Sequence, residues 1–344
     1  MDVHLNTLYV TTPGSYLRRD RMNVVVEIDK NPRGAFPIHH LEGIALFGRV
    51  MVSSAVMAFC QESAIPITFL SESGRLLARV DAPRSGNVLL RREQFRLADR
   101  PDACAHLARS FVAGKLHNAR NTLLRAARDT AEPVDRASFE KAASMIAGHI
   151  EDLPTATSTD AIRGHEGDSA RVYFEVFPSL IRQPRRADFP MKGRSRRPPL
   201  DRVNAMLSFT YALLQNDCLS GLVAAGLDPD VGFLHVDRPG RPSLVLDLVE
   251  EFRTLVADRL VLALINRQQI TSAHFVDRDG GSVEMTVDGR KTLIQAFVAR
   301  KRELVRHPLL EAEVKIGQLP FLQAKLLARQ IRGDCETYIP CVLK

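Results

Sequence analysis

The spacing of hydrophobic and polar positions changes near residue 85. Before that point, short β-branched runs bounded by turn residues predict strands, and SESG (71–74) predicts a hairpin turn. The predicted strands are TLYVTT (7–12), MNVVVEI (22–28), PITFL (66–70) and RLLARV (75–80). The apolar spacing of residues 53–64 predicts a helix among them.

From residue 87 onward, apolar residues recur with the period of a helix, interrupted by Pro and Gly. The only later strands we expect are 272–278 and 282–289, which flank an Asp-Gly-Gly turn. The sequence therefore predicts an α+β protein. A small N-terminal β-rich domain (1–85) is followed by a larger, mainly α-helical domain (86–344).

Composition leaves room for two domains and suggests a class of partner. The chain has 344 residues, 45% of them hydrophobic, and a domain usually takes about 100–200 residues. Its 47 Lys and Arg exceed its 40 Asp and Glu, and the net charge of +7 suits a polyanion without proving one. The five cysteines are scattered, and no window approaches the ~18 apolar residues of a membrane span. We expect a cytoplasmic protein without disulfides, a zinc cluster or a membrane segment.

The segment RGHEGDSARVYF (163–174) places an acid, Glu166, on the apolar face of a predicted helix that follows a loop at 154–164. The stripe in line with it is Ala170, Tyr173, Phe174, Phe177 and Ile181. A buried carboxylate needs a compensating cation, so an arginine ion pair and a metal ion both fit Glu166. Tyr173 is either a packed core residue with a tethered hydroxyl or a supporting site residue.

Positive charge is concentrated in residues 182–202, which hold seven Arg and one Lys against two Asp. Four prolines exclude a long helix, and an extended arginine-rich loop suits phosphate contacts because guanidinium groups bind phosphate oxygens in pairs. A solvated surface loop with few core residues explains the same composition. The candidate DNA-binding residues are Arg182, Arg185, Arg186, Lys192, Arg194, Arg196 and Arg197.

A further segment, GFLHVDRPGRPSLVLDLVEEFR (232–253), carries His235 in a loop and Asp247 and Glu250 on a helix that Ser243 is expected to cap. Together with an acid on another helix, these groups form an oxygen and nitrogen ligand set suited to Mg²⁺ or Mn²⁺. No local spacing rule links them, and a lone histidine near a helix start is more often a structural hydrogen-bonding group. The residues alone leave both roles open.

Three blocks together carry a family resemblance: RGHEGDSARVYF, RSRRPPLDRVNAMLSFTYALL (194–214), and GFLH followed by GRPSLVLDLVEEFR (240–253). In order, spacing and content they resemble the CRISPR adaptation integrase, the first of the numbered Cas proteins. The segment 41–80 agrees too, so the resemblance covers essentially the whole chain. It implies that residues 1–85 help to form a homodimer and that residues 86–344 form a metal-dependent catalytic domain.

The resemblance also implies site residues. That family holds its metal with a Glu, a His and an Asp or Glu, which correspond here to Glu166, His235 and Glu250, with Asp247 as a supporting acid. We expect Mg²⁺ or Mn²⁺ as the cofactor, and a neighbouring acceptor for the second ring nitrogen of His235. The chain departs from the family at Thr254, where a Pro usually follows EEFR.

The implied reaction joins the 3′-hydroxyl of a captured DNA fragment to a phosphodiester at a CRISPR repeat, and also cleaves branched DNA, without a covalent protein intermediate. The implied partners are DNA, a second copy of the chain and the small ferredoxin-like second Cas protein; both ends of the sequence resemble the subtype I-C branch. Two alternatives stay open. A catalytically silent nucleic-acid-binding scaffold needs no metal, and a metallohydrolase for small molecules fits the ligands but not the basic segment.

Overall fold

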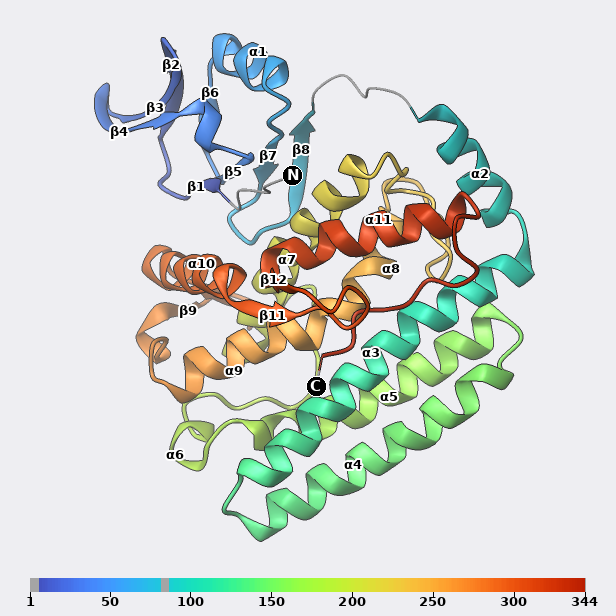
Figure 1. Ribbon diagram of the computed structural model, residues 1–344. Helices are drawn as coiled ribbons and strands as arrows, with labels where there is room; N and C mark the ends of the chain where they lie inside the picture. Colours follow the sequence, from blue (N-terminus) through green and yellow to red (C-terminus); the bar gives the residue numbers. More distant parts are fainter. Residues whose placement is uncertain (1–5, 82–86, 344) are drawn as a thin grey trace.

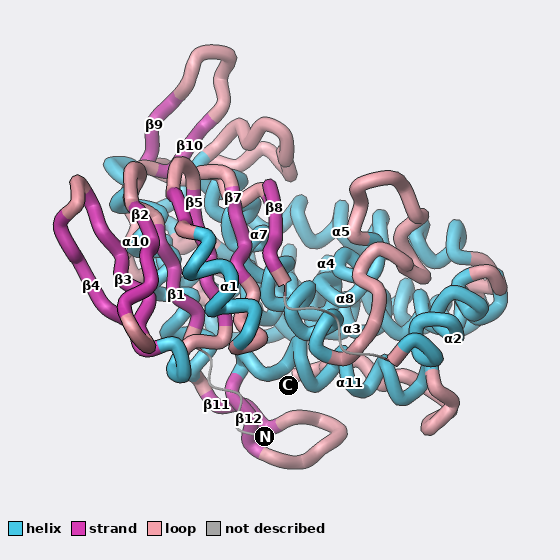
Figure 2. The backbone as a smooth tube through the Cα atoms, turned by 90° about the horizontal axis from the view of Figure 1, so that it is seen from above, coloured by secondary structure: helices cyan, strands magenta, loops and turns pink. Residues whose placement is uncertain are grey.

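The computed structural model of the protein describes residues 6–81 and 87–343 (Figure 1). Strands dominate up to Val80 and helices dominate from Val88, which confirms the predicted α+β fold with its β-rich part first. Figure 2 shows strands β1–β5, β7 and β8 grouped on one side of the molecule, away from helices α3, α4 and α5. The predicted domain boundary at residue 85 lies outside the described residues and stays a prediction. None of the described helices is long and apolar enough to cross a membrane.

The N-terminal part contains two four-stranded sheets, with strand orders β1-β5-β7-β8 and β4-β3-β2-β6. The strands are β1 (Thr7–Val10), β2 (Tyr16–Asp20), β3 (Asn23–Ile28), β4 (Asn31–Pro37), β5 (Gly43–Phe47), β6 (Met51–Val52), β7 (Ile67–Leu70) and β8 (Leu76–Val80). β7 and β8 pair antiparallel, which confirms the predicted hairpin. Helix α1 (Ser54–Glu62) confirms the helix predicted at 53–64, and the Ser53 side chain caps it.

Strand β5 joins the N-terminal sheet to the helical part. It is buried along its whole length, as a central strand covered on both faces should be. Its side chains alternate between two cores: Ile44 and Leu46 pack among the N-terminal strands, whereas Ala45 and Phe47 pack into the large helical core. The sheet β1-β5-β7-β8 therefore has one face on each core, and this holds the two parts of the chain together.

The helical part is built around two long helices. Its helices are α2 (Val88–Ala98), α3 (Pro101–Asp129), α4 (Pro133–Asp152), α5 (Thr159–Leu180), α6 (Gln183–Arg186), α7 (Arg202–Ala224), α8 (Ser243–Phe252), α9 (Arg259–Asn266), α10 (Val287–Arg302) and α11 (Leu319–Ile331). Helix α7 is buried on nearly all sides and packs against α8 and α11. Helix α3 packs against α4, α5 and α8 (Figure 1). Helix α8 therefore lies against both long helices.

Some local predictions were wrong. The pair β9 (Phe275–Asp277) and β10 (Val283–Met285) confirms the later hairpin, but β11 (Leu304–Arg306) and β12 (Glu313–Lys315) form a second pair that was not expected. Helix α5 begins at Thr159, inside the segment predicted as a loop, because the Ser158 side chain accepts a hydrogen bond from the Ala161 amide.

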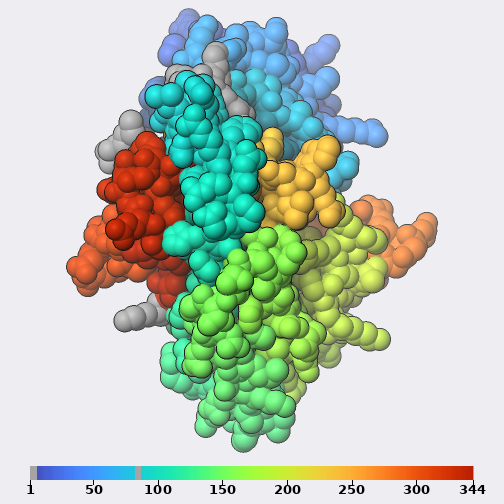
Figure 3. All heavy atoms as spheres, turned by 90° about the vertical axis from the view of Figure 1, so that its right-hand side faces the viewer, coloured from blue at the N-terminus to red at the C-terminus, as the bar shows by residue number. Residues whose placement is uncertain are grey.

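Ser243 does not cap helix α8. Its hydroxyl donates a hydrogen bond to the Val236 carbonyl oxygen at 3.2 Å, and Pro242 occupies the capping position without a side-chain bond. Ser243 therefore fastens the helix to the preceding loop rather than to its own free amides. This loop, coloured yellow-orange in Figure 3, lies at the surface beside the green helices.

Candidate active site

Two predicted site residues, Glu166 on α5 and Glu250 on α8, meet at a lysine from α3. Lys115 Nζ contacts Glu166 Oε1 and lies 2.7 Å from Glu250 Oε2. The three side chains are mostly buried, with 14% of Lys115, 25% of Glu166 and 5% of Glu250 exposed. The arginine considered as a partner for Glu166 is thus replaced by a lysine, which the sequence analysis did not single out.

Neighbouring side chains stabilise the charges on Glu250 and Lys115. Arg253 Nη2 lies 3.0 Å from Glu250 Oε1. Burial opposes ionisation of Glu250, but Arg253 and Lys115 outweigh it and lower the pKa of Glu250 to about 2. Burial also opposes the charge on Lys115, but Glu250 and Glu166 raise the pKa of Lys115 above its usual value. Glu250 and Lys115 are therefore both charged at neutral pH.

Asp247 orients His235 and the loop that carries it. The fully buried Asp247 carboxylate accepts hydrogen bonds from the backbone amides of Phe233, Leu234 and His235 at 2.6, 3.0 and 2.9 Å. Its Oδ1 also lies 2.7 Å from His235 Nδ1. When the carboxylate accepts this bond, Nδ1 carries the proton, and in the neutral imidazole Nε2 then keeps its lone pair. Asp247 is thus the neighbouring acceptor that His235 was expected to have.

The donor chemistry around Lys115 fits a divalent cation. Glu166 and Glu250 offer carboxylate oxygens and His235 offers a ring nitrogen, the ligands that Mg²⁺ and Mn²⁺ accept. Both Glu250 oxygens face cations, Oε2 at 2.7 Å from Lys115 Nζ and Oε1 at 3.0 Å from Arg253 Nη2. Within residues 6–81 and 87–343, no three His, Cys, Asp or Glu side chains converge closely enough to hold an ion, and the Lys115 ammonium stands between the two glutamates. The ligand set stays a prediction.

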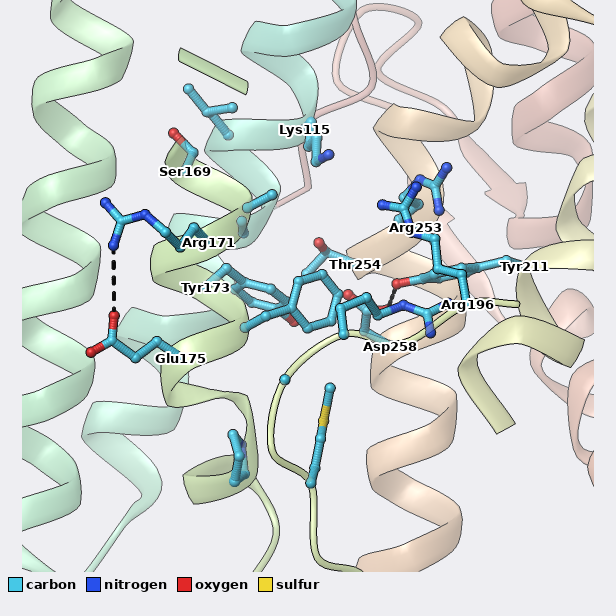
Figure 4. A pocket seen from close by; sticks show the side chains of 18 of the residues that line it. Lys115, Ser169, Arg171, Tyr173, Glu175, Arg196, Tyr211, Arg253, Thr254 and Asp258 are labelled. Carbon is cyan, nitrogen blue, oxygen red and sulfur yellow. Dashed lines mark hydrogen bonds and ion pairs between the residues drawn. The ribbon is translucent and has the colours of Figure 1, made fainter. Parts of the chain in front are cut away.

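A pocket of about 580 Å³ opens beside Lys115 (Figure 4). One wall is the π-helical segment Arg253–Asp258, which links α8 to α9 at the position where the family usually has a Pro. Tyr211 donates a hydrogen bond to Asp258 Oδ1 at 2.6 Å, and burial raises the pKa of Asp258 to about 6. π-Helical turns are frequent at functional sites. The pocket therefore places tyrosine, carboxylate and guanidinium groups next to the glutamates.

Tyr173 lies on the α5 side of this pocket (Figure 4). Its ring packs edge-on against Phe174 and Phe177, which confirms the apolar stripe predicted for the helix. Its buried hydroxyl makes no hydrogen bond of ordinary geometry to any described residue. Burial, followed by the nearby Asp258 carboxylate, raises the pKa of Tyr173 well above its usual value. The packing role is observed, and the supporting role at the site stays a prediction.

The basic segment 182–202 divides into internal and exposed side chains. Arg186 donates to Asp135 Oδ2 at 2.5 Å, and Arg194 donates to Asn204 Oδ1 at 2.6 Å and to Ser208 Oγ at 3.1 Å. The buried residues of the segment are Phe189 and Met191, which agrees with the expectation that it carries few core residues. The remaining basic candidates are exposed, namely Arg182, Lys192, Arg196 and Arg197, or partly exposed, in the case of Arg185. A phosphate-binding role stays a prediction, and it suits the exposed side chains better.

The segment 338–343 fastens α8 to α3 beside the glutamates. Glu251, the buried neighbour of the candidate ligand on α8, accepts hydrogen bonds from Tyr338 Oη at 2.5 Å and from the Cys341 amide at 2.9 Å. Asn118 of α3 donates to the Cys341 carbonyl oxygen at 2.8 Å and to the Glu251 carbonyl oxygen at 3.0 Å. The three elements therefore hold one another in place around Lys115.

Comparison with known proteins gives the family. Residues 8–299 match the family described as CRISPR associated protein Cas1. A relative from Chlorobaculum tepidum, named CRISPR-associated endonuclease Cas1 1, is 49% identical over 342 residues, which cover 99% of each chain. A solved structure titled casposase bound to integration product has a TM-score of 0.83 at 21% identity, covering 97% of this chain and 92% of the other.

A chain of a Cas6-RT-Cas1–Cas2 complex has a TM-score of 0.84 at 21% identity, and the match covers 100% of this chain and 37% of the other. At such identities the two structures show a shared fold. The family match and the identity to the Chlorobaculum tepidum protein go further and span nearly the whole sequence. The chain therefore belongs to the CRISPR-associated Cas1 family.

Proposed function

We propose that this protein is a divalent-metal-dependent DNA integrase and endonuclease of CRISPR adaptation. In the proposed reaction, the 3′-hydroxyl of a captured DNA fragment attacks a phosphodiester at a CRISPR repeat, a new phosphodiester forms, and the leaving 3′-oxygen takes a proton. Cleavage of branched DNA is the reverse sense of the same exchange. The relative named as an endonuclease and the fold shared with a casposase bound to integration product support this proposal.

The observation that carries the proposal is the pairing of Glu166 and Glu250 around one cationic position, next to a histidine already oriented by Asp247. Both glutamates contact a single charged atom, Lys115 Nζ. Two mostly buried carboxylates directed at one point form a site suited to positive charge. Glu166, His235 and Glu250 are the residues we propose to hold Mg²⁺ or Mn²⁺.

When bound, such an ion supplies Lewis-acid activation of the attacking oxygen and stabilises charge on the phosphoryl group. The chain's own residues supply position. Arg253 fixes one oxygen of Glu250, and Asp247 fixes the tautomer of His235. Exposed Lys192 and Arg196 line the pocket and would hold the DNA backbone, since phosphate contacts set register without reading sequence.

The proposed assembly has further members. We propose that residues 1–85 mediate homodimerisation and that the dimer joins Cas2, as a structure of a Cas6-RT-Cas1–Cas2 complex with the same fold suggests. A monomer mass of 38.3 kDa across a wide dilution range in light scattering would argue against the dimer. The subtype I-C assignment also stays a prediction.

The proposal is tested by strand transfer with a labelled DNA bearing a free 3′-hydroxyl and a repeat-containing target. Wild type, Glu166→Ala, His235→Ala and Glu250→Ala are compared in Mg²⁺, in Mn²⁺ and in chelator, at matched DNA occupancy. Each variant should lose strand transfer and branched-DNA cleavage while still binding DNA. Glu140→Ala, on the exposed face of α4, is the matched control. Full wild-type activity in chelator would overturn the proposal.

A catalytically silent nucleic-acid-binding scaffold is the second candidate, and one observation favours it. Lys115 already compensates both glutamates, as it would if their role were only structural. The scaffold predicts DNA binding that is indifferent to divalent ions and no strand transfer in any of them. The same assay therefore separates the two functions.

A further inference from the structure

We propose that Lys115 is a tethered counter-cation that trades places with the divalent ion: it neutralises Glu166 and Glu250 when no metal is bound and moves to a DNA phosphate when the metal enters. The inference rests on the proposed function, because it takes these glutamates as metal ligands. It adds a residue that neither the sequence analysis nor the family match assigned. The consequence is a site that stays folded and charge-balanced without metal.

The contacts of Lys115 make the exchange necessary. Its Nζ touches Glu166 Oε1 and lies 2.7 Å from Glu250 Oε2, the oxygens that face each other across the site. A divalent ion bound to these oxygens at about 2.1 Å would lie in the space that Nζ occupies. Two cations cannot share that space, because close like charges repel strongly where water is scarce. The ammonium must therefore leave when the ion arrives.

The position of Lys115 also shows where the ammonium can go. Lys115 lies within the 29-residue helix α3, so its backbone is fixed, but its side chain is a flexible four-carbon stem. It lines the 580 Å³ pocket together with Lys192, Arg196 and Arg253 (Figure 4). A lysine released from the glutamates would thus remain on the wall of this pocket. A backbone phosphate of DNA is the anion that would become its new partner there.

The arrangement balances the charge of the two glutamates before metal binds. Lys115 contacts both glutamates, and Arg253 contacts Glu250. Without such compensation, two carboxylates directed at one point would repel each other. The lysine therefore keeps the two carboxylates together at the site, but it also competes with the metal for them. Its removal should raise metal affinity and lower the stability of the metal-free protein.

The test is a titration of the DNA-free, full-length protein with Mn²⁺ alone, followed by calorimetry and by electron paramagnetic resonance of the free ion. Lys115→Met should bind Mn²⁺ at least about tenfold more tightly than wild type, the factor expected if fewer than about one site in ten is open while the lysine is present. Lys141→Met, which removes a charge from the exposed face of α4, should bind as wild type does. Equal or weaker binding by Lys115→Met would overturn the inference.

Two further measurements keep the test sharp. Lys115→Arg keeps the charge, so its Mn²⁺ affinity should stay near that of wild type; tightening equal to that of Lys115→Met would exclude charge competition. Lys115→Met should also melt at a lower temperature in chelator and gain more from Mn²⁺ than wild type does. If it does not fold in chelator, the variant is purified in Mn²⁺ and the ion it retains is compared with that of wild type during dialysis against stepwise lower Mn²⁺.

The proposed movement of Lys115 to a DNA phosphate is tested at saturating Mn²⁺. Lys115→Met should then show a shallower salt dependence of DNA affinity, by about one unit of the log–log slope, because one phosphate contact is lost. An unchanged slope would overturn the transfer to phosphate. If the proposed function is wrong, wild type and Glu166→Ala should bind Mn²⁺ with equal affinity. If only the inference about Lys115 is wrong, Mn²⁺ binding should require Glu166 but have the same affinity in wild type and Lys115→Met.

Discussion

Asp247 Oδ1 lies 2.7 Å from His235 Nδ1, and both Asp247 oxygens also accept hydrogen bonds from backbone amides of the same loop. The carboxylate is completely buried. Its oxygens are thus already engaged in holding the loop and the imidazole. This geometry suits a positioning residue for His235 better than a metal ligand.

Asp247→Asn should therefore reduce strand transfer by about 10–100-fold, less than the loss expected for His235→Ala, because the imidazole would lose its oriented tautomer but not its ring. Single-turnover rates in Mn²⁺ measure this directly. Asp237→Asn is the matched control, since Asp237 lies in the same loop and accepts the Gly232 amide at 3.1 Å without a hydrogen bond to His235 among the described residues. A loss equal to that of His235→Ala would make Asp247 a ligand.

The stability of the two glutamate variants should differ. If the two glutamates had no cation beside them, they would repel each other, and removing one would stabilise the protein. Here Lys115 and Arg253 offset that repulsion. Glu250→Gln should lower the free energy of unfolding by on the order of 3 kcal/mol, because two buried cations lose a partner. Glu166→Gln should cost about 1 kcal/mol or less, since Glu166 is more exposed. Urea unfolding in chelator tests this, and a gain in stability for both variants would contradict it.

Much of the site was accessible from the sequence because its parts lie in distinctive segments. Glu166 was conspicuous as an acid on an apolar stripe, and the GFLH loop stood beside a helix with two acids. Lys115 gave a weaker signal: it is a single lysine in a long amphipathic helix, and its partners lie 51 and 135 residues away in sequence, by subtraction from 166 and 250. Periodicity identifies which face of a helix is buried, but not which remote charge meets it.

The fold shows the same division. Strands with strong β-branched runs were predicted, whereas β5, with its mixed sequence GIALF, and the short pair β11 and β12 were not. The start of α5 was misplaced because one hydroxyl, that of Ser158, caps it inside a stretch rich in Thr and Ser. In segment 182–202, charge counting overlooked that Arg194 and Arg186 bind other parts of the chain. Local composition does not reveal such tertiary hydrogen bonds.

The buried carboxyl group of Asp258, at the pocket, should make the free energy of unfolding depend on pH. Burial raises its pKa from 3.8 to about 6, so between these values the folded protein binds the proton more tightly than the unfolded chain. The free energy of unfolding should therefore fall as pH rises from about 4 to about 6, by ~3 kcal/mol at most from this group. In Asp258→Asn this component disappears. Urea unfolding across this pH range gives the difference, and parallel curves for both proteins would refute the assignment.

Contact between α3 and the segment 338–343 depends on Gly114. A Cβ at this position would lie 2.8 Å from Pro340 Cβ and 3.1 Å from Glu251 Cγ. Gly114→Ala should therefore destabilise the protein by about 1–3 kcal/mol and slow strand transfer, since it displaces α8 from α3. Gly148→Ala on α4 is the matched control: its Cβ would meet nothing within 4 Å, and it should stabilise by roughly 0.5–1 kcal/mol. Equal effects of both changes in thermal melts would remove the packing explanation.

Substitutions of exposed and of internal arginines in segment 182–202 should have different effects on DNA binding and on stability. Arg196→Ala with Arg197→Ala should weaken DNA binding for all sequences and reduce the log–log salt slope by about one unit per contact, with the melting temperature unchanged. Arg194→Ala should instead lower the melting temperature, because Asn204 and Ser208 lose their donor. Fluorescence anisotropy at several salt concentrations distinguishes the two. An unchanged slope in the double variant would make these side chains ordinary surface.

We propose that Glu166, His235 and Glu250 together hold one divalent ion. Anomalous diffraction from crystals grown in Mn²⁺ tests it most directly, because it locates the ion without relying on activity. We expect one peak at about 2.0–2.3 Å from an oxygen of each glutamate and from His235 Nε2, with Lys115 Nζ displaced from its present contacts. A peak elsewhere, or Lys115 still between the two glutamates at saturating Mn²⁺, would contradict it.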